Sequence, residues 1–119
     1  MAEEQQVYGS VDDMVSDGAS EVEYKEIEGF KPGKMIRIGS VSAGDMIEWS
    51  EANESEAKRT AGLRLITKSL VNDKGVRISS DKDILKLRTM RHNVTERIVK
   101  EILKLNGMTV KQDKDAKND

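Results

Sequence analysis

The segment from Leu70 to Asp83, LVNDKGVRISSDKD, is the stretch of this sequence that most resembles a metal-binding loop. A calcium loop between two helices places oxygen ligands at its positions 1, 3 and 5, a glycine at position 6 and a bidentate acid at position 12. With Gly75 at position 6, Asp81 stands at position 12, but Leu70 and Lys74 occupy positions 1 and 5. Leucine has no ligand atom and lysine repels a cation, so the segment is predicted to be a turn in which Gly75 takes a positive φ.

Other residue types that support catalysis are sparse. The chain has no cysteine, which excludes disulfides, thiolate nucleophiles and thiolate metal sites, and it has one histidine, His92. A histidine acting as a general base needs a nucleophile beside it, and nothing in the sequence marks one. The glycine-containing segment GFKPGK (29–34) has the wrong spacing for a phosphate-binding loop. We therefore expect no enzymatic activity, no metal site and no cofactor.

Composition indicates one small domain with a highly charged surface. The chain has 119 residues, of which 35% are charged and 36% are apolar, enough for one compact domain with a modest core. The beginning MAEEQQVYGSVDDM lacks the basic and apolar regions of a signal peptide, and no apolar run approaches the length of a membrane span. We expect a protein of the cytoplasm.

Charge is distributed unevenly along the chain. Residues 1–20 hold five acids and no Lys or Arg, whereas residues 21–107 hold 17 basic and 14 acidic residues. We expect an acidic flexible arm at 1–20, a single domain at 21–107, and a flexible polar tail at 108–119. Arg64 and Lys68, and Arg88 and Arg91, have helical spacing and are candidate phosphate contacts, although basic residues among acids more often form a solvated face.

The first part of the domain has the pattern of a β-hairpin. The segment SEVEYKEIE (20–28) approximates an alternation of apolar and polar residues, with Val22, Tyr24 and Ile27 as its apolar members. MIRIGSV (35–41) places Ile36 and Ile38 on one side of a strand, and the loop between the two segments contains two glycines and the single proline. An isolated hairpin is marginally stable, so we expect helices to cover its apolar face.

Helical patterns follow the hairpin. Ser42 is a good N-cap for a short helix that carries Met46 and Trp49, and residues 54–72 form a second helix with a broad apolar face. Residues 79–93 and 94–107 are predicted to form two more helices, the last with a strong apolar stripe and an Asn-Gly stop. The expected fold is α+β and mainly α-helical, with a short N-terminal hairpin followed by about four helices and flexible termini.

The order of these features resembles a known family. The segments KMIRIGSVSAGDMIEW, AKRTAGLRLITKSLVNDKGVRI and SDKDILKLRTMRHNVTERIVKEILKLNGM, which lie between residues 22 and 108, are similar to the tail assembly chaperones of long-tailed bacteriophages and prophages. In that family a helix ends in an Asp/Asn-x-x-Gly turn before an Asp-rich helix start, and the final helix often ends in Leu-Asn-Gly. The motifs are patterns of residue type and include no catalytic signature.

This resemblance implies a function based on binding. Such chaperones bind the tape-measure protein, a long apolar helical protein, keep it soluble, and help recruit tail-tube protein; they stay in the host cytoplasm and are absent from the mature virion. Binding would use apolar stripes that accept a helix. The candidate partner-binding residues are Met46, Trp49, Leu63, Ile66, Leu70, Ile98, Ile102 and Leu105. Because a small core needs the same side chains, we expect most of them to be buried, and self-association could cover others.

Two alternatives come from other functional classes. A small nucleic-acid-associated regulator would use Arg64, Lys68, Arg88 and Arg91, and its binding would weaken steeply as salt rises. A structural subunit would remain in the phage particle.

Overall fold

The computed structural model describes residues 6–19, 21–52 and 55–108 of the chain. Within these residues the elements are helix α1 (Val11–Ala19), strands β1 (Tyr24–Glu28) and β2 (Met35–Gly39), helices α2 (Ala43–Glu51) and α3 (Ser55–Ser69), strand β3 (Leu70–Val71), a 3-10 turn (Asp81–Asp83), and helices α4 (Ile84–Leu87) and α5 (His92–Leu105). The α+β class, the hairpin and the four helices after it are confirmed.

The sheet is antiparallel with the order β1-β2-β3. Strands β1 and β2 form the predicted hairpin, in which Ile27 lies opposite Ile36. Of the apolar residues predicted to alternate along the first strand, Ile27 is buried, whereas Val22 and Tyr24 are exposed. The face that carries Ile27 is therefore the one that the helices cover.

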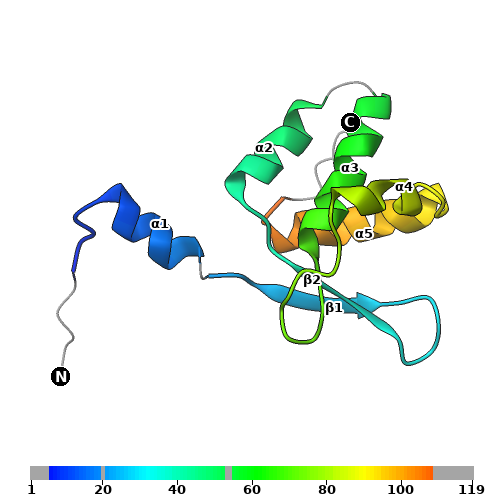
Figure 1. Cartoon of the computed structure of the whole chain (residues 1–119), viewed down its shortest axis with the longest axis horizontal. Coiled ribbons are helices and arrows are strands. Elements are labelled where there is room, and N and C mark those ends of the chain that lie inside the picture. The colour runs from blue at the N-terminus through cyan, green and yellow to red at the C-terminus, as the bar shows by residue number, and fades with distance from the viewer. Residues whose placement is uncertain (1–5, 20, 53–54, 109–119) are drawn as a thin grey trace, which may run out of the picture.

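Helices α3 and α5 pack against that face of the sheet and cross one another (Figure 1). The core is a cluster of buried apolar side chains from β1, β2, α3 and α5: Ile27, Ile38, Leu65, Ile66, Ile98, Ile102 and Leu103. Gly62 of α3 lies close to α5, because a Cβ atom there would lie 3.4 Å from the Val99 side chain.

The turn after β3 has the predicted structure. The Asn72 side-chain oxygen accepts hydrogen bonds from the backbone N–H groups of Lys74 and Val76, and Gly75 has a φ of 79°. After the turn, an isolated bridge pairs Arg77 with Val71. The turn is thus built from backbone and amide contacts, as its Asn-Asp-Lys-Gly composition indicates.

The sequence prediction was wrong for part of the segment that follows. We expected one helix over residues 79–93, but α4 has four residues and ends at Leu87. The N–H groups of Thr89 and Met90 donate to the carbonyls three residues earlier, those of Lys86 and Leu87. Such bonds tighten the last turn of a helix, and Arg91 is then extended, with a ψ of 142°, so that α5 starts at His92 in a new direction.

The N-terminal segment contains a helix that we did not expect. Within the predicted acidic arm, residues 11–19 form α1, which has no buried residue and stands apart from the rest of the molecule (Figure 1). Residues 1–5 and 20 of the arm, and 109–119 of the predicted tail, lie outside the described residues. The flexibility of both termini stays a prediction.

Candidate partner-binding surface

Helix α2 has a local sequence that defines its start and gives it two different sides. The Ser42 side-chain oxygen accepts a hydrogen bond from the Asp45 N–H at 3.1 Å, which is the predicted N-cap. Met46 and Trp49, three residues apart, are half-buried and pack against the core, whereas Ile47 is 54% exposed. The helix therefore contacts the body on one side and offers an apolar side chain to solvent on another.

Trp49 is held in place by the neighbouring helix. The Lys58 ammonium group donates a hydrogen bond to the Trp49 carbonyl oxygen at 2.7 Å and lies 4.0 Å from the centroid of the indole ring. A cation over an aromatic face is attracted by its quadrupole, so Lys58 fixes both the backbone and the ring. A second contact between the two helices is the ion pair of the Arg64 guanidinium group of α3 with the Glu48 carboxylate of α2, at 2.8 Å.

The structure separates the eight candidate residues into two groups. Ile66, Ile98 and Ile102 belong to the core and are at most 3% exposed, so in this conformation they have almost no surface to offer a partner. The other five are half-buried and pack against the core cluster: Met46, Trp49, Leu63, Leu70 and Leu105. Their role in binding stays a prediction. Ile47, which we did not include, is an exposed apolar residue on the same helix as Met46 and Trp49.

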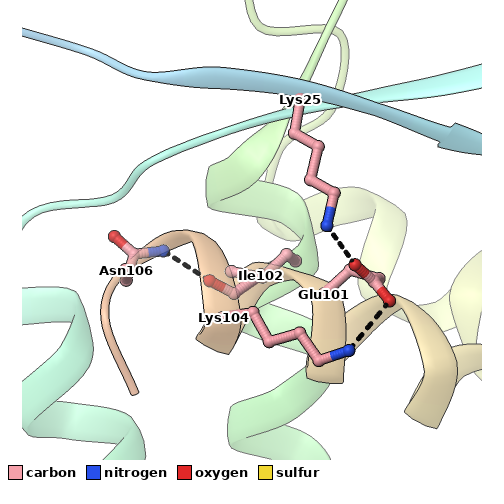
Figure 2. Close-up of polar contacts among 5 residues, drawn as sticks. All are labelled: Lys25, Glu101, Ile102, Lys104 and Asn106. Carbon is pink, nitrogen blue, oxygen red and sulfur yellow. Dashed lines mark hydrogen bonds and ion pairs between the residues drawn. The ribbon is translucent and has the colours of Figure 1, made fainter. Parts of the chain in front are cut away.

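The end of α5 is connected to the segment that precedes α2. The Asn106 amide group donates to the Ile102 carbonyl oxygen at 2.7 Å (Figure 2), and its side-chain oxygen accepts from the Val41 N–H at 3.0 Å. The N–H of Gly107, which has a φ of 81°, donates to the Lys104 carbonyl oxygen, and the N–H of Met108 donates to the Leu103 carbonyl oxygen. This pair of bonds is a Schellman motif, which ends the helix. The Asn-Gly pair predicted as a helix stop also positions the start of α2 relative to α5, which the sequence did not indicate.

Glu101 connects α5 to the edge strand of the sheet. Its carboxylate lies 2.6 Å from the Lys25 ammonium group of β1 and 3.6 Å from that of Lys104 (Figure 2). The hydrogen bond from Lys25 is the main reason that the pKa of Glu101 is lowered from its ordinary value, while partial burial of the carboxyl group opposes the shift. The ionised carboxylate thus helps to hold β1 on α5.

Replacing Glu101 by Gln should reduce stability in a pH-dependent way. Because the pKa of the folded carboxyl group is lowered, its stabilisation is present above the ordinary value of 4.5 and is lost as pH falls through the lowered pKa. We expect a loss of about 0.5 kcal/mol at pH 8, as for a partly exposed ion pair, measured by urea unfolding. The difference between the two proteins should disappear near pH 2. A difference that is constant from pH 8 to pH 2 would contradict a charge-based role.

The single histidine lies at the surface. His92 is exposed at the first position of α5, 3.3 Å from the Glu96 carboxylate. Among the residues that the structure describes, no three His, Cys, Asp or Glu side chains are grouped so that they could hold a metal ion. Of the basic residues considered for nucleic acid, Arg64 is engaged with Glu48. No helix within the described ranges is long and apolar enough to cross a membrane.

Comparison with known proteins gives a likeness among solved structures. No family model and no curated protein sequence matches this chain. Among solved structures, the chain is similar to the tail assembly chaperone of bacteriophage HK97, with a TM-score of 0.58 and 16% sequence identity over 83% of this chain and 99% of that one. The family resemblance inferred from the sequence is thereby confirmed at the level of structure: this chain has the fold of a phage tail assembly chaperone.

Proposed function

We propose that this chain is a bacteriophage tail assembly chaperone that binds and solubilises the tape-measure protein and helps to recruit tail-tube protein. The observation that supports the proposal is the shared fold, which extends over nearly the whole length of the HK97 chaperone. The same proposal places the protein in the host cytoplasm during assembly and outside the mature virion. It requires no catalysis.

The surface that we assign to the partner centres on α2. Ile47 is exposed on the outer side of α2, while Met46 and Trp49 are half-buried on the side that packs on the core, where Lys58 keeps the indole in one orientation. A rigid aromatic side chain that is already ordered loses little conformational entropy on binding, which is why Trp is frequent among the residues that dominate interface energies. An apolar helix of the tape-measure protein would lie against this surface.

Variants of α2 test this assignment. Ile47→Asp should leave the fold intact, because Ile47 is 54% exposed, and should weaken binding to the tape-measure protein by about 30-fold, the loss typical of an interface hot spot. Leu85→Asp is the matched control, since Leu85 on α4 is 72% exposed and lies outside the assigned surface. Affinity would be measured by competition, in which each variant displaces a labelled wild-type chain from its soluble complex with the tape-measure protein. Equal affinities of the two variants for the tape-measure protein would show that the binding site lies away from α2.

A further inference from the structure

Helix α1 has an apolar side that is open to solvent in the described structure. Val11, Met14 and Val15 lie on that side and are 69%, 50% and 56% exposed. Asp12 and Asp17 lie at its two margins, where a helix of 3.6 residues per turn places them. A nine-residue helix is marginal in water unless its apolar side is covered. The pattern of α1 is therefore that of a helix that gains stability from a partner.

The outer side of α2 carries the same combination of residue types. Ile47 is 54% exposed, and Glu51, which lies one turn further along the same side, is also exposed. Glu51 is the last residue of α2, where a negative charge is unfavourable for the helix dipole, so it does not stabilise the helix in that way. Neither α1 nor α2 contains a lysine or an arginine. Each helix thus presents apolar side chains bordered by carboxylates.

The two helices are anchored at the same point of the sheet. The Glu23 carbonyl oxygen accepts from the Ser40 N–H at 2.8 Å, and the Ser40 hydroxyl group accepts from the Glu23 N–H at 3.1 Å. Helix α1 ends at Ala19, shortly before this point, and α2 begins after its N-cap Ser42, shortly beyond it. Figure 1 shows α1 to the left of the sheet and α2 above it. A single partner segment can therefore contact both helices.

Charge disfavours direct packing of α1 on α2. Asp12 and Glu51 would border the same apolar contact, and like charges that face one another across an interface repel. A third element with positive charges at its margins removes this repulsion, because it pairs with the carboxylates of both helices. The two helices together therefore select a basic partner.

We propose that α1 and α2 form a clasp that closes on one helix of a partner protein. The apolar stripe of that helix would lie between Met14 of α1 and Ile47 of α2. Lysine and arginine side chains at its margins would approach Asp12 and Glu51. This inference rests on the proposed function and deepens it, because it specifies which helix of the tape-measure protein would lie on α2: an amphipathic one with a basic border.

Two synthetic peptides test the charge preference of the clasp. Each has about 20 residues, long enough to form a helix, with leucines spaced along one face. Lysines border the leucines in one peptide and glutamates border them in the other. The full chain should bind the lysine peptide about 100-fold more tightly than the glutamate peptide, because like charges at an interface are costly. Fluorescence anisotropy of the labelled peptides measures both affinities.

Hydrogen exchange on the full chain shows whether both helices take part. With the lysine peptide bound, the backbone amides of α1 and α2 should exchange about tenfold more slowly than in the free chain, because a covered helix opens less often. The amides of α4, which lies outside the clasp, should exchange at an unchanged rate. Slower exchange in α2 alone would overturn the clasp.

Matched variants identify the contributing side chains. Met14→Ser should weaken binding of the lysine peptide about tenfold, whereas Leu85→Ser, at an exposed apolar residue of α4, should not. Asp12→Asn and Glu51→Gln should each weaken it about threefold, as for an exposed ion pair. Asp73→Asn, at an exposed acid in the turn after β3, should leave the affinity unchanged. Thermal unfolding of every variant checks the fold.

Three results separate the clasp from the proposed function. Equal affinities for the two peptides, or wild-type affinity of Met14→Ser for the lysine peptide, would overturn the clasp. A soluble complex with the tape-measure protein that forms equally well with Met14→Ser would also overturn it, while the proposed function would stand. A chain that binds the lysine peptide through both helices but leaves the tape-measure protein insoluble would support the clasp and contradict the proposed function.

Discussion

Replacing Ile102 by Ala should lower the free energy of unfolding by about 2–5 kcal/mol, the range for large-to-small substitutions in a core. Ile102 is fully buried at the centre of the cluster formed by the sheet, α3 and α5. Its side chain touches elements far apart in the sequence, so removing three carbons leaves a cavity that the surrounding helices cannot fill by a local shift. Urea unfolding at pH 7 measures the change.

Leu105 provides the control for this substitution. It lies one turn further along the same helix and belonged to the same predicted set, but it is half-buried at the edge of the core. Leu105→Ala should therefore cost clearly less than Ile102→Ala. Equal losses at the two positions would show that Ile102 is not the central core residue that its burial indicates.

Replacing Ser69 by Ala should lower the free energy of unfolding by about 2 kcal/mol, because buried backbone groups would lose their partner. Ser69, the last residue of α3, is fully buried, and its hydroxyl group donates to the Gly39 carbonyl oxygen at 2.6 Å and accepts from the Gly39 N–H at 3.2 Å. The β2–β3 register pairs Ile38 with Leu70, so Gly39 would next face position 69. The hydroxyl group thus replaces a backbone partner in the β2–β3 pairing, at the position where α3 ends and β3 begins.

Ser50 is the matched control for Ser69. Its hydroxyl group donates to the Ile47 carbonyl oxygen at 2.9 Å, but the residue is exposed, so water can replace the bond. Ser50→Ala should change stability by less than about 0.5 kcal/mol. An equally small loss of stability for Ser69→Ala would contradict this role. It would mean that the N–H and carbonyl groups of Gly39 do not depend on the Ser69 hydroxyl group.

Local patterns were sufficient to predict the elements that depend on local interactions. The Gly-Pro-Gly loop between two β-branched segments predicted the hairpin, and the apolar spacing of Val94, Ile98 and Ile102 predicted α5. Asn72 and Gly75 predicted their turn because the amide side chain and the positive φ act within four residues. In each case the local preference agrees with the packing of the whole domain, so the local pattern identifies the element.

Elements that depend on distant contacts were not predicted. Strand β3 was expected to be the last turn of a helix, but Leu70 and Val71 pair with β2 instead. The helix expected over 79–93 breaks after Leu87. Pairing with β2 overrides helical periodicity at Leu70 and Val71, and a pattern of residue types does not contain that information.

Which of the candidate partner-binding residues are buried could not be predicted, for the same reason. Amphipathic stripes identify apolar faces but do not say which of them the rest of the molecule covers. Ile66 and Leu63 lie three residues apart on α3, yet one is fully buried and the other half-buried. The contact of Lys58 with Trp49 joins residues on two helices, and only their packing brings the pair together.

The central claim, that this chain keeps the tape-measure protein soluble, is tested most directly by co-expression. The candidate tape-measure protein would be produced at equal levels with and without this chain, and its soluble fraction quantified, followed by purification through a tag on this chain. The account predicts an insoluble tape-measure protein alone, and a soluble one that co-purifies when the chain is present. A tape-measure protein that stays insoluble and forms no complex with the correctly folded chain would contradict it.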